Sequence, residues 1–154
     1  MPRADVVLVE LGLAPSRTVA QRLIAAGRVH VERGSRSVTV KKSSETLDAG
    51  EAVGITPDPA DRYVSRGALK LEGALVRTGV SVSGRLALDV GQSTGGFTDC
   101  LLQAGAARVV GIDVGHGQLH PRIADDPRVV AFEGINARAL DLAAIRAAAG
   151  QDSI

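Results

Sequence analysis

The sequence predicts an α/β chain in two parts: a small α+β module over residues 1–60, and the first βαβαβ half of a doubly wound parallel sheet over residues 61–154. In the first part, helical spacing of apolar residues gives way to alternation. Residues 56–61 hold two prolines and two acids, which is typical of a linker. Beyond it, apolar runs of strand length alternate with helical segments, which implies parallel strands covered by helices.

The first part contains two predicted helices and three predicted strands. Apolar residues between Val6 and Leu11 indicate a first helix that ends near Gly12. Ser16 is a suitable N-cap for a second helix, and Gly27 is a suitable C-terminal stop. Period-two alternation then predicts strands at residues 28–31, 37–40 and 52–55, the first two joined by a turn at 33–35.

The second part contains three predicted helices and three predicted strands. Each apolar run is assigned by its period, its length and the turn residues that bound it. The predicted order is helix 67–78, strand 86–90, helix 96–104, strand 109–112, strand 129–132 and helix 141–149. We expect the first of these strands to be an open edge, because three parallel strands are half of a doubly wound sheet.

The composition, 45% hydrophobic and 23% charged residues, is that of a soluble globular protein. No apolar stretch reaches the roughly 18 residues that span a bilayer, and the N-terminus lacks a signal-peptide layout. Cys100 is the single cysteine, which excludes an intramolecular disulfide and a thiolate metal cluster. The sequence therefore predicts a cytoplasmic protein with no metal site and no membrane partner.

The charge distribution is uneven although the net charge is only +1. Residues 15–42 carry seven basic side chains against the single acid Glu32, whereas residues 43–61 carry five acids and no base. The basic segment is about the size of one nucleic-acid contact surface. From charge alone, it is either such a surface or a solvated arginine-rich face.

The stretch LALDVGQSTGGFT at residues 86–98 passes from a strand into a glycine-rich turn. Gly91, Gly95 and Gly96 let the backbone approach a ligand closely, and the helix after them offers free N–H groups. Asp113 closes the next strand, where its carboxylate can accept hydrogen bonds from the hydroxyls of a ribose. The alternative is that the glycines only permit close helix–strand packing and that Asp113 caps a turn.

Asp89 narrows the choice of ligand. A dinucleotide-binding turn usually reads GxGxxG, with a pyrophosphate over the helix N-terminus, whereas here an acid stands before the first glycine. A carboxylate suits the positively charged amino group of S-adenosylmethionine better than it suits a phosphate. S-adenosylmethionine is therefore the expected cofactor, and NAD is the alternative.

Several motifs of the second part resemble the TlyA-type rRNA 2′-O-ribose methyltransferases, once named haemolysins, of the FtsJ-like group. These motifs are residues 64–71 (VSRGALKL), 88–98, 113–119 (DVGHGQL), 126–129 (DPRV) and 136–138 (NAR). The first part resembles a small RNA-binding module named after a ribosomal small-subunit protein, on Arg3, Asp5, Leu8 and the segments 12–20 and 27–31. The resemblance implies a Rossmann-like, S-adenosylmethionine-dependent methyltransferase domain, with ribosomal RNA or a ribosomal subunit as partner and no DNA.

The resemblance also implies roles for individual residues. The implied reaction transfers a methyl group to a ribose 2′-hydroxyl, and Lys70 matches the first lysine of the family's Lys–Asp–Lys–Glu set, which would orient or help deprotonate that hydroxyl. The residues expected to bind the cofactor are Asp89, Gly91, Ser93, Thr94, Gly95, Gly96, Asp113 and Asn136. The residues expected to meet RNA are Ser16, Arg17, Gln21, Arg22 and Arg28.

Two departures from the family pattern bear on activity. The other three members of the catalytic set are not in these 154 residues, and Asp152, with no apolar strand around it, does not replace them. We therefore expect a truncated or interrupted gene product that is active only if the missing half is supplied; the alternative is an RNA-binding protein with a vestigial cofactor half-site. Gln92 stands where alanine is expected and is predicted to narrow the cofactor site.

Overall fold

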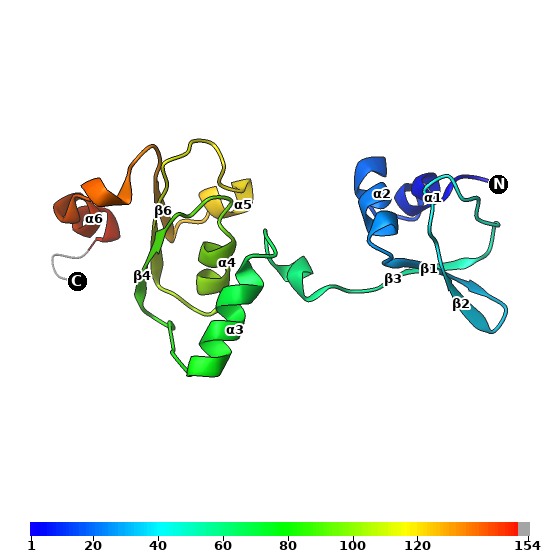
Figure 1. Cartoon of the computed structure of the whole chain (residues 1–154), viewed down its shortest axis with the longest axis horizontal. Coiled ribbons are helices and arrows are strands. Elements are labelled where there is room, and N and C mark those ends of the chain that lie inside the picture. Colours follow the sequence, from blue (N-terminus) through cyan, green and yellow to red (C-terminus); the bar gives the residue numbers. More distant parts are fainter. Residues whose placement is uncertain (151–154) are drawn as a thin grey trace. The chain divides into compact units, whose positions relative to one another are not determined.

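A computed structural model describes residues 1–150 of the chain (Figure 1). The described residues divide into two compact units, one from Met1 to Asp58 and one that begins at Pro59. Each unit has its own three-stranded sheet and its own hydrophobic core. The mixture of helices and strands confirms the predicted fold class. Asp152 lies outside the described residues.

The N-terminal unit packs two helices with an antiparallel sheet. Its Ser16 hydroxyl accepts a hydrogen bond from the Val19 amide at 3.3 Å, and Gly27 adopts a positive φ of 69° just after the second helix. Both predicted ends of this helix are confirmed. The elements are α1 (Ala4–Glu10), α2 (Arg17–Ala25), β1 (Val29–Arg33), β2 (Arg36–Thr39) and β3 (Ala52–Ile55), with the strands in the order β2-β1-β3.

The first helix begins earlier than its apolar pattern predicts. The amides of Ala4 and Asp5 donate to the carbonyls of Glu45 and Ser43, at 2.7 and 3.3 Å, in the segment between β2 and β3. These amides belong to the first turn, where the helix itself provides no acceptor. The start of α1 therefore depends on a distant part of the chain, which periodicity cannot reveal.

The second unit is a three-layered α/β arrangement. Its parallel strands β4 (Leu86–Val90), β5 (Arg108–Ile112) and β6 (Val129–Phe132) lie in the order β4-β5-β6. Helices α3, α4 and α5 cover one face of this sheet and α6 covers the other (Figure 1). These helices span Ala68–Thr78, Gly96–Gln103, Pro121–Ala124 and Leu142–Ala149.

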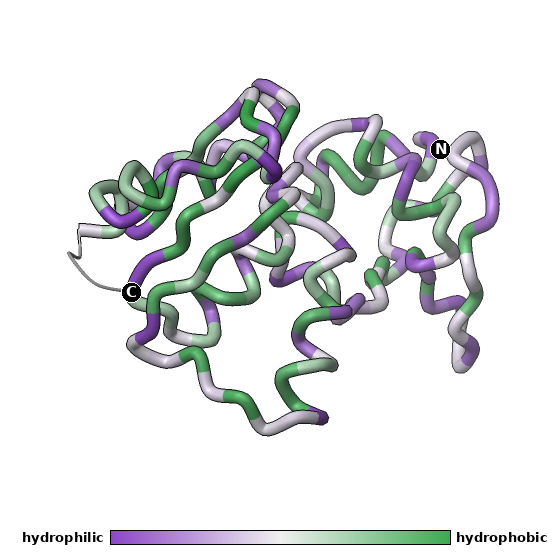
Figure 2. Tube along the Cα trace, turned by 60° about the vertical axis from the view of Figure 1, so that its left-hand side comes forward, coloured by the Kyte–Doolittle hydropathy of each residue, from purple (hydrophilic) through white to green (hydrophobic). Residues whose placement is uncertain are grey.

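The central strand β5 is buried on both faces. Val109 packs in a cluster with Leu102 of α4, whereas Val110 and Ile112 pack in a cluster with Ile145 of α6. Successive side chains of a strand point to opposite faces, so a strand covered on both sides reads as a continuous apolar run. Hydrophobic stretches of this kind are separated by hydrophilic turns along the chain (Figure 2).

Strand β4 is an edge strand. Within residues 1–150 it pairs with β5 and with no other strand. Its side chains Leu88 and Val90 remain 48% and 54% exposed. The predicted open edge is therefore confirmed for the described part of the chain.

Three short elements were absent from the sequence prediction. The second half of the expected linker forms a 3₁₀ helix, η1 (Pro59–Arg62), and the boundary between the two compact units falls between Asp58 and Pro59, within the expected linker. A second 3₁₀ helix, η2, spans Ala137–Ala139, and α5 is a single turn. Proline opens both η1 and α5, positions where its fixed φ and missing N–H are tolerated. Elements of three or four residues are too short to show a period.

Candidate functional site

The glycine-rich turn lies between the carboxyl end of β4 and the start of α4. The amides of Gly91 and Gln92 both donate to the Ile112 carbonyl at the end of β5, at 2.7 and 3.1 Å. Gly91 and Gly95 adopt φ values of 79° and 97°, which residues with a Cβ rarely adopt. The turn therefore favours glycine at these two positions and lies at the carboxyl edge of the sheet.

A cavity of about 230 Å³ opens on this turn. Its walls come from the turn and from the segment that precedes α3: Ser65, Gly67, Asp89, Val90, Gly91, Gln92, Ser93, Thr94, Gly96 and Phe97. Five of the predicted cofactor-binding residues are in this set. Gly95 is not, because it faces away from the cavity: a Cβ there would lie 2.8 Å from Cδ1 of Leu119.

The segment before α3 lies directly over Gly96. A Cβ on Gly96 would lie 2.9 Å from Ser65 Oγ and 3.3 Å from the Ala68 amide nitrogen. The Gly67 amide donates to Ser65 Oγ at 3.1 Å. Glycine at position 96 therefore permits a close approach between α4 and this segment. The sequence prediction did not include Ser65 and Gly67, although both lie in the motif that contains Lys70.

Asp89 is a buried carboxylate at the end of β4, with a relative exposure of 6%. Its Oδ2 accepts a hydrogen bond from the Thr98 hydroxyl at 2.7 Å, and Thr98 in turn accepts one from Gln92 Nε2 at 2.9 Å. Burial raises the pKa of Asp89; hydrogen bonds from Thr98 oppose this, and the Asp113 charge adds to it. A positively charged ligand group would favour the ionised form.

Gln92 lies in the cavity wall, and the narrowing of the cofactor site expected of it remains a prediction. Its side chain is buried, and its carboxamide is turned toward Thr98 and Gly111 of β5. A Cβ on Gly111 would overlap this carboxamide. The absence of a side chain at Gly111 thus provides the space that Gln92 occupies under the turn.

Asp113 braces two turns. Its Oδ2 accepts a hydrogen bond from the Ser93 amide at 2.7 Å, and its Oδ1 accepts one from the Gly115 amide at 2.8 Å. Both hydrogen bonds lower the pKa of Asp113, and the bond from the Gly115 amide has the larger effect. Asp113 does not line the cavity of about 230 Å³. The geometry provides the turn-capping role that the sequence left as the alternative, and ribose binding by Asp113 remains a prediction.

Two other predicted residues also lie outside the cavity wall. Asn136 is exposed, and its Oδ1 accepts a hydrogen bond from the Arg138 amide at 2.9 Å, which caps η2. Lys70 is exposed in the first turn of α3, three residues after Gly67. Neither residue lines the cavity, so the catalytic role of Lys70 and the cofactor-binding role of Asn136 remain predictions.

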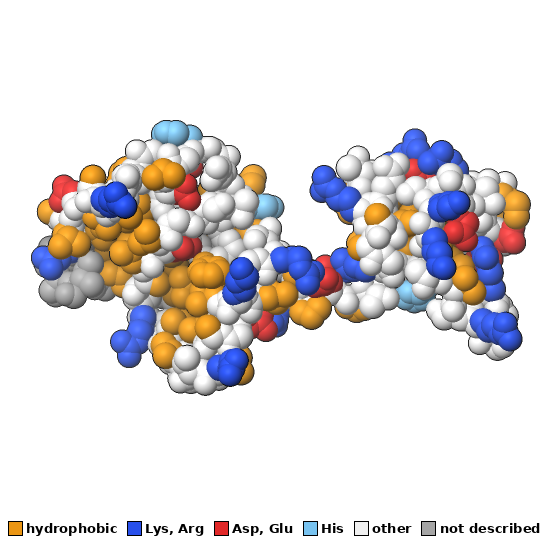
Figure 3. Space-filling view, viewed as in Figure 1, with side chains coloured by type: hydrophobic (Ala, Val, Ile, Leu, Met, Phe, Trp, Pro, Cys, Tyr) orange, Lys and Arg blue, Asp and Glu red, His pale blue; other side chains and the backbone are white. Residues whose placement is uncertain are grey.

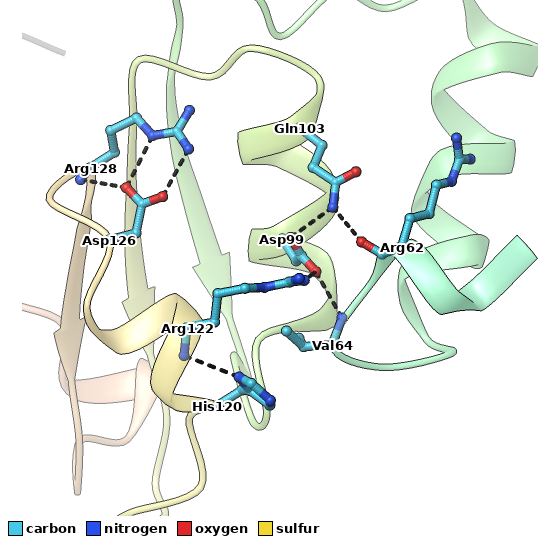
Figure 4. A network of polar contacts seen from close by, with 8 residues as sticks. All are labelled: Arg62, Val64, Asp99, Gln103, His120, Arg122, Asp126 and Arg128. Atoms are coloured by element: carbon cyan, nitrogen blue, oxygen red, sulfur yellow. Dashed lines mark hydrogen bonds and ion pairs between the residues drawn. The ribbon is translucent and has the colours of Figure 1, made fainter. Parts of the chain in front are cut away.

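A polar network centred on Asp99 fixes the segment before α3 (Figure 4). The side chain of Asp99 accepts hydrogen bonds from the Val64 amide at 2.8 Å, from Arg122 Nη2 at 2.8 Å and from Gln103 Nε2 at 3.1 Å. Gln103 also donates to the Arg62 carbonyl at 2.6 Å. The network therefore ties residues 62–64 to α4 and α5, and it was missed by sequence reasoning because its partners are far apart in the chain.

The predicted RNA-binding residues lie at the N-cap of α2, on α2 and just before β1, and Lys and Arg side chains gather on the N-terminal unit (Figure 3). Arg17 and Gln21 both donate to Asp5, at 2.9 and 2.8 Å. Arg28 Nε donates to the Thr56 carbonyl at 3.0 Å. Ser16 caps α2 as described, and Arg22 is exposed. Four of the five residues thus also have a structural contact.

Within residues 1–150, no group of three or more His, Cys, Asp or Glu side chains is placed to hold a metal ion. No helix among the same residues is both long enough and apolar enough to cross a membrane.

Family models match both units. Residues 63–151 match the FtsJ-like methyltransferase family, and residues 2–34 match the S4 domain. The S4 match covers α1 and α2 and the first strand of the N-terminal unit, and the FtsJ-like match covers more than half of the chain.

Individual relatives agree with these matches. A 16S/23S rRNA (cytidine-2′-O)-methyltransferase TlyA of Mycobacterium tuberculosis is 46% identical over 143 residues, 93% of this chain and 52% of that protein. Hemolysin A of Brachyspira hyodysenteriae is 42% identical over 88% of this chain and 54% of that protein. A solved structure of a hemolysin-like protein of Streptococcus thermophilus has a TM-score of 0.58 and 38% identity, covering 93% of this chain and 51% of its own. The chain spans about half the length of these relatives. It belongs to the FtsJ-like methyltransferase family, in the TlyA and hemolysin group that combines this domain with an S4 domain.

Proposed function

We propose that this chain takes part in the transfer of a methyl group from S-adenosylmethionine to a ribose 2′-hydroxyl of ribosomal RNA, in the cytoplasm. The observation that carries the proposal is the cavity between the glycine-rich turn and the segment 65–67, with buried Asp89 in its wall. A relative that is 46% identical is named as an rRNA (cytidine-2′-O)-methyltransferase.

The residues around the cavity fit S-adenosylmethionine. The Asp89 carboxylate can pair with the ammonium of the methionine part, whereas a pyrophosphate would be repelled by it. The bare backbone at Gly91, where an added Cβ would meet no atom within 4 Å, lets the ligand approach the sheet edge. When bound, S-adenosylmethionine supplies a methyl group on a positively charged sulfur. NAD is the alternative that Asp89 disfavours.

Lys70 is the proposed catalytic residue. A ribose 2′-hydroxyl is a poor nucleophile while protonated, so it must be aligned with the methyl group and its developing negative charge must be stabilised. The Lys70 ammonium, in the first turn of α3 and three residues after Gly67 of the cavity wall, would donate a hydrogen bond to that oxygen.

The S4 domain is the proposed RNA-binding part. The basic side chains of residues 15–42 would contact phosphates and sugars, which set affinity and salt dependence but carry no sequence information. Aromatic residues are 2% of the chain, so stacking on bases contributes little, and folded RNA shape is the expected target.

A second candidate function is RNA binding without catalysis. The cavity of about 230 Å³ is smaller than the roughly 300–1,000 Å³ of common ligand pockets. Residues 1–150 therefore enclose only part of a molecule as large as S-adenosylmethionine. In this case the N-terminal unit would act alone, or catalysis would require a further polypeptide to complete the site.

Two measurements test these functions. Calorimetry with S-adenosylmethionine and with NAD, repeated with Asp89→Ala, tests the cavity; tighter binding of NAD would contradict the cofactor assignment. Transfer of a tritiated methyl group to deproteinised ribosomal RNA tests catalysis, with Lys70→Ala expected to abolish transfer and to leave RNA binding within about twofold. RNA binding without transfer by the unsubstituted chain would favour the second candidate.

A further inference from the structure

Asp5 is a fully buried carboxylate in the first turn of α1, with a relative exposure of 0%. It accepts hydrogen bonds from Arg3 Nε at 3.1 Å, from Arg17 Nη2 at 2.9 Å and from Gln21 Nε2 at 2.8 Å. Longer contacts come from Arg3 Nη2 at 3.4 Å and from Arg17 Nε at 3.3 Å. The hydrogen bonds from Gln21 and the two arginines hold the pKa of Asp5 well below its usual range.

The two arginines that hold Asp5 are not themselves buried. The side chains of Arg3 and Arg17 are 49% and 57% exposed, although each uses Nε and Nη2 to contact Asp5. Within residues 1–150, no hydrogen bond engages Nη1 of either side chain. Each guanidinium therefore donates to the Asp5 carboxylate through Nε and Nη2, and its Nη1 donors point away from that carboxylate.

Arg3 and Arg17 are adjacent because they bind the same carboxylate. Two guanidiniums side by side repel each other, and the negative charge of Asp5 between them offsets that repulsion. The cluster of Asp5, Arg3 and Arg17 still carries one net positive charge. Gln21 adds a neutral donor that holds the carboxylate without adding charge.

We propose that Asp5 is a positioning residue that holds Arg3 and Arg17 as a preformed site for a phosphate group of the RNA backbone. This role rests on the proposed RNA binding by the S4 domain. Two guanidinium groups match the geometry of a phosphate, which accepts hydrogen bonds on several oxygens. Because their side chains are ordered before RNA arrives, less conformational entropy is lost on binding. This proposal adds Arg3 to the residues expected to contact RNA, because the set predicted from the sequence did not contain it.

Removal of the Asp5 charge distinguishes an effect of side-chain positioning on RNA binding from an effect of net charge. Asp5→Asn makes the unit more positive, so an effect of charge alone would strengthen RNA binding. Loss of positioning would instead weaken it. Glu10→Gln is the matched control, because it removes an exposed negative charge at the end of the same helix.

The test measures binding of the full chain to deproteinised 16S ribosomal RNA over a range of KCl concentrations. We expect Asp5→Asn to bind about tenfold more weakly at 0.1 M KCl. The plot of log binding constant against log KCl concentration should also be less steep by roughly 0.7–0.9, which corresponds to the loss of one phosphate contact. Glu10→Gln should bind equally or more tightly, with an unchanged slope. A loss of folded protein would reduce the binding amplitude, not the slope.

A second variant covers the case in which Asp5→Asn does not fold. The doubly substituted chain Arg3→Lys/Arg17→Lys keeps Asp5 and the total charge but replaces both guanidinium forks. We expect it to bind RNA at least fivefold more weakly. Binding equal to the unsubstituted chain by either variant would overturn the positioning role. Absence of RNA binding by the unsubstituted chain would instead overturn the proposed function, and this role with it.

Discussion

The Thr98 hydroxyl donates a 2.7 Å hydrogen bond to the Asp89 carboxylate, and both side chains are buried between β4 and α4. Thr98→Val keeps the shape of the side chain and removes the donor. A hydrogen bond to a charged group contributes about 1.5–3 kcal/mol, so we expect affinity for S-adenosylmethionine to fall by about ten- to a hundredfold. Calorimetry measures this, and Thr98→Ser should retain most of the affinity.

A second ligand makes the Thr98 prediction specific to the ammonium. Methylthioadenosine has the adenosine and sulfur of S-adenosylmethionine but lacks the amino-acid part. Its affinity should change little in Thr98→Val, since no ammonium meets Asp89. An equal loss for both ligands would mean that the substitution disturbs the whole turn.

The raised pKa of Asp89 predicts a pH dependence of cofactor binding. Burial is the main cause, so Asp89 binds a proton at a higher pH than an exposed aspartate, whose pKa is near 3.8. The ionised form attracts an ammonium and the protonated form does not. Affinity for S-adenosylmethionine should therefore weaken as pH falls from neutral, before ordinary carboxylates titrate. The profile should be flat in Asp89→Asn; a flat profile in the unsubstituted chain would contradict the assignment.

The complementary shapes of Gln92 and Gly111 predict a coupled pair. Gly111→Ala places a methyl group where the Gln92 carboxamide lies, and overpacking of this kind costs about 1–3 kcal/mol of unfolding free energy. Gln92→Ala removes the obstacle, so the double substitution should recover most of that loss. Denaturation followed by circular dichroism measures both effects. Additive losses in the double variant would show that the two residues do not compete for the same space.

The Asp99 network predicts a loss of both stability and cofactor binding. Asp99→Asn weakens the contacts to Val64 and Arg122, and we expect a loss of roughly 2–4 kcal/mol of unfolding free energy, between the values for surface and buried ion pairs. S-adenosylmethionine should bind more weakly to the folded fraction, because Ser65 follows Val64 into the cavity wall. The control is Asp126→Asn, which removes the ion pair with Arg128 in the loop between α5 and β6 (Figure 4) and should cost under roughly 1 kcal/mol.

Features with a local cause could be predicted from the sequence. The ends of α2 follow from Ser16 and Gly27, whose roles involve only their own turn. The parallel sheet follows from apolar runs of strand length, since strands buried on both faces leave that pattern. The glycine-rich turn was predicted for the same reason: a positive φ at Gly91 is a property of the backbone there.

Features that depend on distant partners could not be predicted in detail. The Asp113 carboxylate accepts a hydrogen bond from the amide of Ser93, 20 residues earlier in the chain, and a pattern of residue types does not reveal such a partner. The partners of Asp99 come from three separate segments. Asp5 left one signal, because it occupies a helical position three residues before buried Leu8 and thus faces the core.

The two hydrophobic cores have a practical consequence for all of these experiments. Within residues 1–150, the cluster that contains Leu8 and Val31 shares no residue with the clusters that contain Val109 and Ile145. Substitutions in one unit should therefore add to substitutions in the other without interaction energy. Each unit can therefore serve as the internal control for the other: binding of S-adenosylmethionine should be unchanged in an Asp5 variant, and RNA binding should be unchanged in a Thr98 variant.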